Sequence, residues 1–340
     1  MKRFRVAVAA CGWMSQEWIK YALSRKDLEI VALMDIDEKM AKKRANDFGL
    51  KCGIYTDIAK AIEDSGANLV FDITPPAVRK KTVITALEMG CDVFGEKPMA
   101  QSLQDAKDMI SVADKTGRMY AVTQNRRYLK PLRGLRELIK SGKIGKPSFV
   151  CADFFIGLHN CGFRLFMKSP LLVDMAIHTF DKARFLIGSN PVSVHAYEFS
   201  PKGSWYKGDA CAICTFEFAD GTIFSYRGSW CTEGCVTSWD STWRIAGVKG
   251  TAVWDGFDDA YYEIPLPSGK KEFGKKLKRL KVPGLWKGRK YHFGVLDEMF
   301  SALIDGRRAE TDCRDNIKSL AMVFAAVESA SKGKKVKIKY

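Results

Sequence analysis

The stretch VAVAACGWMSQEW, from Val6 to Trp18, changes its hydrophobic pattern in the middle. It begins as a short, continuous apolar run, which is typical of a strand buried on both faces. It ends with apolar residues at helical spacing among polar ones, which predicts an amphipathic helix. A strand that passes through so tight a turn into a helix is half of a βαβ unit, so this stretch predicts a parallel sheet.

The alternation of strands and helices continues to residue 124. Apolar runs of strand length are followed by amphipathic segments of helical length, as in a doubly wound parallel sheet. Strands are expected at residues 4–10, 29–35, 51–55, 68–73, 92–98 and 119–125, and helices at 13–24, 36–48, 57–64, 77–90 and 103–117. Ligands of such sheets bind at the carboxyl ends of the strands.

The pattern changes after residue 124. Helices are expected at residues 128–142 and 170–187, five or six alternating strands between 191 and 265, and two helices at 291–306 and 315–333. This order predicts an α+β domain with a large, mainly antiparallel open sheet. The expected domains are therefore residues 1–124 and 125–340, with the C-terminal helix able to pack back on the first domain.

The turn after the first strand resembles the dinucleotide-binding pattern G-x-G-x-x-G, whose glycine positions fall on Ala10, Gly12 and Ser15. Alanine and serine are small, and the helix N-terminus attracts phosphates whatever its side chains. Asp35, at the end of the second strand, is placed to bind a ribose hydroxyl. An acid there favours NAD over NADP, because it repels a 2′-phosphate. The alternative is an ordinary tight turn beside a loop acid.

Two further motifs carry chemically active residues. Glu96, Lys97 and Pro98 follow the fifth strand at the expected ligand-binding edge, where a lysine can hydrogen-bond a substrate hydroxyl. In LLVDMAIHTFDKARFL, residues 171–186, Asp174, His178 and Asp181 share one face of the expected helix. Either His178 is a core histidine satisfied by an acid, or it is a general base oriented by a carboxylate.

These features, in this order, resemble the glucose-fructose oxidoreductase/inositol dehydrogenase/MocA (Gfo/Idh/MocA) family over essentially the whole chain. Residues 68–100 resemble the family's T-P-P loop, helix, fifth strand and E-K-P motif, and VDMAIHTFD resembles its D-x-x-x-H-x-x-D signature. NRRY, residues 125–128, lies where the family often has an Arg-containing junction. The chain departs from the family at Trp13, usually a small or aliphatic residue, and at Arg79, commonly a histidine.

The resemblance implies a Rossmann domain followed by an α/β domain whose open sheet often forms the oligomer interface. It also implies that Lys97, Asp174 and His178 are catalytic. His178 would take the proton of a substrate hydroxyl as hydride leaves for the nicotinamide. Asp174 would orient the substrate or tune His178, and Lys97 would hydrogen-bond the reacting oxygen. Asp181 would orient the helix or His178 from behind.

The resemblance also assigns binding residues. The cofactor residues are Ala10, Gly12, Trp13, Met14, Asp35, Thr74, Pro75, Glu96, Lys97 and Asn125. The substrate candidates are Arg127, His159, Asn160, Arg164 and Tyr206. The cations among them suit an acidic sugar or a phosphate, or Arg164 anchors its own loop.

The expected activity is reversible NAD-dependent oxidation of a hydroxyl on a sugar, an inositol-like polyol or a sugar acid. Two alternatives stay open: NAD-assisted glycoside hydrolysis, and a non-enzymatic sensor of sugars or nucleotides. A sensor has no need of a general base, so the set Lys97, Asp174 and His178 argues against it. The expected partners are a small carbohydrate and further copies of this chain, as a homodimer or homotetramer through the C-terminal sheet.

The composition of the chain bears on the cellular location of the protein and on the classes of partner that it binds. The chain has 340 residues and a net charge of +16, and ten basic residues with one acid lie between Lys270 and Lys290. That segment is expected to be a solvated loop or hairpin, because no nucleic-acid-binding fold accompanies it. No apolar run is long enough to span a membrane, and the N-terminal run is so short that we do not expect it to be a signal peptide. A cytoplasmic protein without membrane or nucleic-acid partners is expected.

The ten cysteines are expected to be free thiols of a reducing compartment. Cys211, Cys214, Cys231 and Cys235 have a spacing near that of a zinc site. However, Cys211 and Cys214 fall in an expected strand, where residues three apart point to opposite faces. No metal site is therefore expected.

Overall fold

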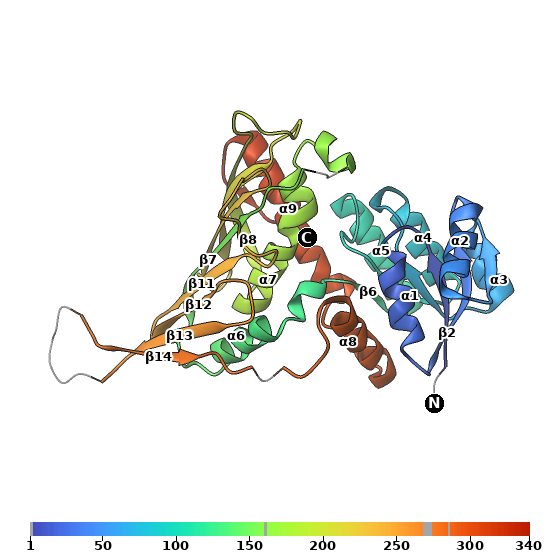
Figure 1. The fold of residues 1–340 in the computed structure, drawn as a ribbon, viewed down its shortest axis with the longest axis horizontal. Helices are drawn as coiled ribbons and strands as arrows, with labels where there is room; N and C mark the ends of the chain where they lie inside the picture. The colour runs from blue at the N-terminus through green and yellow to red at the C-terminus, as the bar shows by residue number, and fades with distance from the viewer. Residues whose placement is uncertain (1–2, 160–161, 268–273, 285) are drawn as a thin grey trace. The chain divides into compact units, whose positions relative to one another are not determined.

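The computed structural model describes residues 3–159, 162–267, 274–284 and 286–340. It divides into two compact units (Figure 1). The first unit contains residues 1–125 and 289–320, and the second contains residues 126–288 and 321–340. The stretch 289–320 therefore groups with the N-terminal residues rather than with the sequence that precedes it.

The first unit is built on a parallel sheet. Six described strands are hydrogen-bonded in the order β3-β2-β1-β4-β5-β6, the strand order of a dinucleotide-binding fold. The strands are β1 (Phe4–Ala9), β2 (Leu28–Met34), β3 (Gly53–Tyr55), β4 (Leu69–Asp72), β5 (Asp92–Gly95) and β6 (Tyr120–Val122). The order reverses between β1 and β4, which places the loops after these strands at the crevice where such sheets bind ligands.

Helices flank this sheet (Figure 1). They are α1 (Ser15–Leu23), α2 (Glu38–Phe48), α3 (Ile58–Ser65), α4 (Pro76–Glu88), α5 (Leu103–Thr116) and α8 (Tyr291–Asp305), and α9 (Cys313–Lys332) begins in this unit. The strands are apolar and β1, β4 and β5 are almost wholly buried, because both faces of a parallel sheet are covered. The sequence predicted the parallel sheet, its six strands and the tight turn from β1 to α1, but it placed α8 in the second domain.

The second unit is built on a larger mixed sheet. Nine described strands lie in the order β14-β13-β12-β11-β7-β10-β9-β8-β15, and all neighbouring pairs are antiparallel except β7 and β10. They are β7 (Pro147–Phe155), β8 (Pro191–Phe199), β9 (Cys211–Phe218), β10 (Ile223–Ser229), β11 (Thr242–Gly247), β12 (Gly250–Trp254), β13 (Ala260–Pro265), β14 (Leu277–Lys281) and β15 (Val336–Lys337). This confirms the predicted α+β architecture with its mainly antiparallel sheet.

The helical segments of the second unit include α6 (Lys130–Lys140) and α7 (Ile177–Ile187), on one side of the sheet in Figure 1. Three short segments are also described: η1 (Asn125–Arg127), which spans the boundary between the units, η2 (Gly162–Phe166) and η3 (Leu171–Ala176). The other face of the sheet is open, and Phe149, Tyr197 and Ile213 are 45%, 63% and 46% exposed on alternating positions of their strands. Strand alternation therefore buries one face under helices and leaves the other in solvent.

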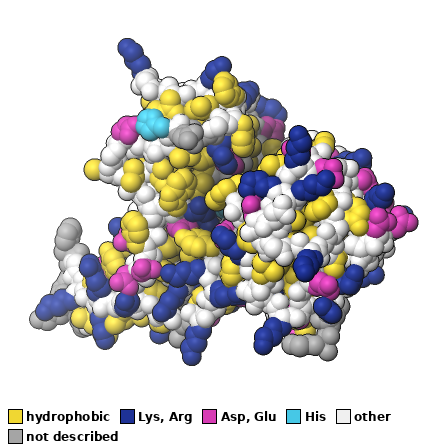
Figure 2. All heavy atoms as spheres, turned by 45° about the vertical axis from the view of Figure 1, so that its right-hand side comes forward, with side chains coloured by type: hydrophobic (Ala, Val, Ile, Leu, Met, Phe, Trp, Pro, Cys, Tyr) yellow, Lys and Arg dark blue, Asp and Glu magenta, His cyan; other side chains and the backbone are white. Residues whose placement is uncertain are grey.

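The basic segment between Lys270 and Lys290 contributes β14, which pairs with β13. In its described part, this segment therefore forms the expected hairpin rather than a loop. Its cations find acidic partners: Arg279 Nε lies 2.7 Å from Glu263 Oε1, and Lys281 Nζ lies 2.6 Å from Asp259 Oδ1. On the face shown in Figure 2, Lys and Arg side chains are scattered and interspersed with Asp and Glu.

No helix in the described ranges is both long enough and apolar enough to cross a lipid bilayer. Similarly, the described residues contain no group of three or more His, Cys, Asp or Glu side chains that could hold a metal ion. Cys211 and Cys231 do come together, with their Sγ atoms 3.7 Å apart.

Candidate functional site

The loop between β1 and α1 keeps the form of a dinucleotide loop although it has only one glycine of the fingerprint. Ala10 adopts a left-handed backbone with φ 74°, a conformation that glycine adopts without strain. A Cβ on Gly12 would meet nothing within 4 Å, so the space above this residue is open. Ser15 is buried and its Oγ donates to the Gly12 carbonyl at 2.6 Å, which closes the first turn of α1.

Two side chains hold this loop from outside it. Asp35, just after β2, accepts a hydrogen bond from the Cys11 N–H at 2.7 Å and another from the Asp37 N–H at 3.0 Å. Arg44, buried on α2, donates to the carbonyls of Cys11 and Gly12 at 3.1–3.3 Å. With its carbonyls turned toward Arg44, the loop is fixed around an open space beside the N-terminus of α1.

The residues present fit NAD. Open space above Gly12 admits the backbone approach that a pyrophosphate needs, and the N-terminus of α1 supplies N–H groups and a favourable dipole. Asp35 stands at the end of β2, where an acid meets a ribose hydroxyl. Trp13 is 74% exposed, so its bulk does not fill the loop.

Replacing Ala10 with glycine is expected to stabilise the protein. A left-handed alanine costs about 1–2 kcal/mol, and the extra chain entropy of glycine offsets about half of this. We therefore expect Ala10→Gly to raise the free energy of unfolding by roughly 0.5–1 kcal/mol in urea titrations. Ala9→Gly, inside β1, is the matched control and should be destabilising. A loss of stability in both variants would contradict the strained conformation of Ala10.

Arg79 joins the two loops that follow β4 and β5. Its Nε lies 2.9 Å from Asp72 Oδ2, and its two Nη groups donate to the carbonyls of Thr74 and Pro98. Thr74 in turn donates to Asp72 from both its N–H and its hydroxyl. Arg79 is 2% exposed, so the residue that departs from the family pattern is an internal brace of the T-P-P and E-K-P loops.

Glu96 is the centre of a buried hydrogen-bond cluster. Its carboxylate accepts from Trp18 Nε1 at 2.8 Å, from the Lys97 N–H at 3.1 Å and from His292 Nε2 at 3.1 Å. The other ring nitrogen of His292 lies 3.1 Å from Asn125 Nδ2. The cluster therefore fixes the backbone that presents Lys97, which is itself partly exposed at the end of β5.

The same contacts set the ionisation of Glu96. Burial alone raises the pKa of a carboxyl, but the hydrogen bonds from His292 and Trp18 outweigh it and lower the pKa of Glu96 from 4.5 to about 2. A carboxyl whose pKa is lower in the folded state stabilises the fold above its unfolded pKa. This contribution is lost as the pH falls from about 5 toward 2.

We therefore expect Glu96→Gln to lower the free energy of unfolding at pH 6, and the deficit to shrink as the pH falls toward 3. Urea titrations of both proteins at several pH values measure this. Glu17→Gln, at an exposed pair with Lys20, is the control and should show no such trend. A deficit that is independent of pH would mean that Glu96 acts by shape alone.

The signature acids and histidine of the second unit lie at a change of helix type. Asp174 lies on η3, a π-helical segment, whereas His178 and Asp181 lie on α7. The prediction of one regular α-helix over residues 170–187 was wrong in this respect, because the wider π turn interrupts it before His178. His178 is 7% exposed, and Arg164 Nε donates to Asp174 Oδ2 at 2.5 Å.

Arg127 and Asp181 form a buried bidentate ion pair. Arg127 Nε and Nη2 each donate to a different carboxylate oxygen of Asp181 at 2.7 Å. Both residues are at most 4% exposed. Arg127 therefore braces η1 against α7, which gives this predicted substrate residue a structural partner on the helix of His178.

The other substrate candidates differ in position. Tyr206 is 5% exposed and its hydroxyl donates to the Leu158 carbonyl at 3.1 Å. His159 is exposed, stacks on Trp205 with centroids 3.9 Å apart, and its Nε2 lies 2.5 Å from Glu233 Oε1. Asn160 lies outside the described residues. Arg164 contacts the signature residue Asp174.

Several contributing residues were missed from the sequence. Arg44 looks like an exposed cation of a helix, and Trp18 and His292 look like core or surface residues of α1 and α8. A signal exists only for Trp18, as a polar-tipped aromatic on an apolar helix face. His292 lies 196 residues from Glu96, so no local pattern joins them.

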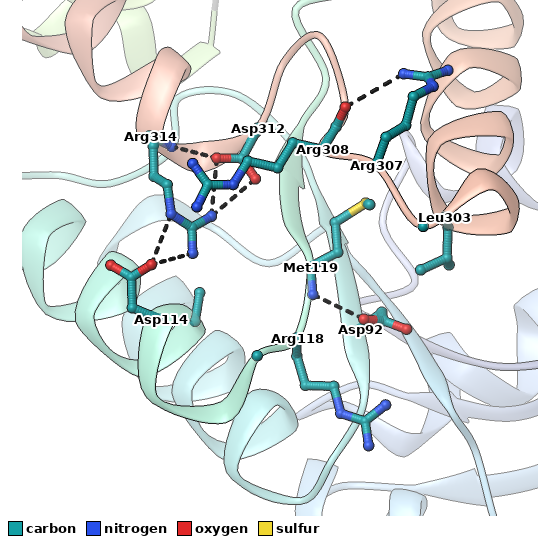
Figure 3. Close-up of a pocket in the computed structure, with 12 residues that line it drawn as sticks. Asp92, Asp114, Arg118, Met119, Leu303, Arg307, Arg308, Asp312 and Arg314 are labelled. Atoms are coloured by element: carbon teal, nitrogen blue, oxygen red, sulfur yellow. Dashed lines mark hydrogen bonds and ion pairs between the residues drawn. The ribbon is translucent and has the colours of Figure 1, made fainter.

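A cavity of about 320 Å³ lies in the first unit at the amino ends of β5 and β6, away from the loops described above (Figure 3). Two of the arginines that line it are paired: Arg314 bonds Asp114 and Asp312, and Arg307 bonds Glu298. It lies between α5 and the α8–α9 connection, at the edge of the sheet opposite the loops that follow β1, β4 and β5.

Comparisons with known proteins agree with the geometry. A model of the GFO_IDH_MocA oxidoreductase family, with an NAD-binding Rossmann fold, matches residues 4–124, and the model of its C-terminal alpha/beta domain matches residues 136–338. The chain is 25% identical to D-apiose dehydrogenase of Rhizobium rhizogenes, over 99% of this chain and 98% of that protein. It is 28% identical to D-glucoside 3-dehydrogenase of Escherichia coli, over 59% of each.

The fold also matches solved structures. An oxidoreductase from Agrobacterium radiobacter, crystallised with NAD+, L-tartaric acid and magnesium, has a TM-score of 0.86 at 24% identity, over 99% of this chain and 98% of that chain. The family models cover nearly the whole chain, and the named relatives are dehydrogenases. The chain therefore belongs to the Gfo/Idh/MocA family of oxidoreductases, and its first unit is the family's NAD-binding Rossmann domain.

Proposed function

We propose that this protein reversibly oxidises a secondary hydroxyl of a sugar, an inositol-like polyol or a sugar acid. The observation that carries this proposal is the retention of both signatures, Lys97 beside the buried Glu96 cluster and His178 four residues after Asp174, in a chain whose dinucleotide loop fits NAD. The names of the relatives, which act on apiose and glucosides, support this class of substrate.

Each signature residue has a proposed role. NAD, when bound, supplies the hydride acceptor. His178 accepts the proton of the reacting hydroxyl as general base. Lys97 hydrogen-bonds the hydroxyl oxygen and stabilises its developing negative charge, while Glu96 holds the lysine backbone through the Lys97 N–H. Asp174 orients the substrate or His178.

The same proposal assigns the cofactor contacts. Ala10, Gly12, Trp13 and Met14 lie on the loop for the pyrophosphate, and Asp35 binds a ribose hydroxyl. The residues assigned to the nicotinamide end are Thr74, Pro75, Glu96, Lys97 and Asn125. Thr74 and Asn125 are buried, so they act mainly by shaping their loops.

Formation of NADH tests the proposal. Purified protein is incubated with NAD+ and a panel of pentoses, hexoses, inositols and sugar acids, and the absorbance of NADH is followed. Turnover of at least one member is the expected result. Release of a sugar from a glycoside without net NADH would instead identify NAD-assisted hydrolysis.

We also propose that the chain assembles as a homodimer or homotetramer through its larger sheet. The supporting observation is the open face that carries Phe149, Tyr197 and Ile213, of which Tyr197 and Ile213 are direct cross-strand neighbours. Exposed apolar side chains grouped on one sheet face are typical of an interface. Light scattering of the purified protein measures the number of copies.

A further inference from the structure

Arg164 reaches a signature residue from a short segment of its own. It lies on η2, and its Nε donates to Asp174 Oδ2 at 2.5 Å. The guanidinium also lies over the ring of Phe163, 4.8 Å from its centroid. These two contacts place a permanent positive charge directly beside Asp174.

Arg164 uses only part of its donor set in these contacts. A guanidinium has five N–H donors, and only Nε is engaged with Asp174. Among the described residues, neither Nη group has a hydrogen-bond partner, and the side chain is one third exposed. The outer edge of the fork can therefore bind a carboxylate or phosphate through two parallel hydrogen bonds.

Both lysines and carboxylates lie around this segment. Residues 162–168 contain Arg164 and Lys168 and no acid. Lys207, on the neighbouring segment, lies with its Nζ 4.5 Å from the ring centroid of Phe166. Lys168 interacts with the carboxylate of Glu198, which also lies near Asp209, so the capacity to bind an anion resides in the Nη groups of Arg164.

The segment is held in place by its backbone. The Lys207 N–H donates to the Leu165 carbonyl at 2.9 Å, and the Asp209 N–H donates to the Lys168 carbonyl at 2.9 Å. Gly208 packs so closely against the carbonyls of Met167 and Lys168 that a Cβ would overlap them. The backbone that carries Arg164 is therefore fixed before a ligand binds, which lowers the entropic cost of binding.

We propose that Arg164 is a specificity-determining residue, which binds an anionic group of the substrate and makes the protein prefer acidic sugars over neutral sugars and polyols. This inference rests on the proposed dehydrogenase function. It narrows the substrate class to a carbohydrate that carries a carboxylate or a phosphate, with the reacting hydroxyl on the same molecule.

Matched pairs of substrates test the inference. NADH formation is measured with D-glucuronate and glucose 6-phosphate against D-glucose, and with D-galacturonate against D-galactose. For the wild type we expect kcat/KM to favour one class of acid by roughly 10–100-fold, the range of a charged hydrogen-bond pair. The preferred class, sugar acid or sugar phosphate, identifies the anion.

Variants assign the preference to the guanidinium. Arg164→Gln should bring the acid-to-neutral ratio close to one, and Arg164→Lys should restore only part of it, because an ammonium lacks the fork. Lys202→Gln removes one charge from an exposed turn five residues before Lys207 and should leave the ratio unchanged. If Arg164 only anchored its loop, its replacement would lower kcat/KM equally for acidic and neutral substrates. It would also lower the thermal unfolding midpoint.

Each outcome bears on the inference separately from the dehydrogenase function. NADH formation with equal kcat/KM for acidic and neutral partners, or a preference that survives in Arg164→Gln, overturns the role of Arg164 and leaves the function intact. If no compound is oxidised, the function fails. The role of Arg164 is then tested by calorimetric titration of D-glucuronate and glucose 6-phosphate in the presence of NAD+. Binding to the wild type that is lost in Arg164→Gln supports the anion site. Equal binding to both proteins, or binding to neither, overturns it.

Discussion

Replacing His178 with alanine is expected to lower kcat by roughly 10²–10⁴-fold, the usual contribution of a general base. His178 is 7% exposed on α7, so its imidazole is held in a defined position before substrate arrives. The dinucleotide loop lies in the first unit, on β1 and α1, so affinity for NAD should survive the substitution. Steady-state kinetics together with a fluorescence titration of NADH measure both quantities.

His195→Ala is the matched control, because His195 is exposed on β8. It should retain wild-type kcat and affinity. Thermal unfolding of both variants shows whether the fold is intact. Wild-type turnover in His178→Ala would refute the assignment of the general base, whereas lost NADH binding would show that the histidine supports the cofactor instead.

Replacing Asp181 with alanine is expected to destabilise the protein by about 3–5 kcal/mol, because it removes the carboxylate opposite a buried guanidinium. Arg127 and Asp181 share two hydrogen bonds of 2.7 Å and are almost inaccessible to solvent. Arg127→Ala should cost less, because Asp181 keeps Arg184 as a buried partner at 3.7 Å. Urea-induced unfolding monitored by tryptophan fluorescence measures the change.

The same unit contains a control with equal geometry and greater exposure. Arg227 and Asp153 form a bidentate pair at 2.7 and 2.6 Å, with 60% of the Arg227 side chain exposed. Asp153→Ala should therefore cost at most about 1 kcal/mol. If Arg127→Ala keeps full stability but raises KM, Arg127 binds substrate, as the sequence alone suggested, rather than bracing α7.

The sequence predicted the fold because its hydrophobic periodicity carries most of the information. Runs such as Val6–Ala10 are continuous because both sheet faces are covered, and β9 alternates because one face is open. Hydrophobic periodicity does not predict the π-helical turns of η3. Asp174 and His178 have α-helical spacing in the sequence, although the backbone at Asp174 is π-helical. The grouping of residues 289–320 with the first unit is likewise a long-range packing result that no local window contains.

The candidate site was predicted where its residues stand next to each other in motifs, as in Glu96-Lys97-Pro98 and Asp174 to Asp181. It was missed where partners lie far apart in sequence. The Glu96 cluster draws on Trp18 and His292, and the loop at Gly12 depends on Arg44. A buried arginine and an exposed one look identical in a sequence, because only tertiary contacts distinguish them.

The transfer of hydride from a carbohydrate to NAD is the central claim, and isotope transfer tests it most directly. The best substrate of the screen is prepared with deuterium on the carbon that carries the reacting hydroxyl, and the NADH formed is analysed by mass spectrometry. We predict one deuterium in every NADH, and a slower reaction in His178→Ala with the same label. NADH without deuterium, or sugar products without NADH, would contradict direct oxidation of that hydroxyl by this protein.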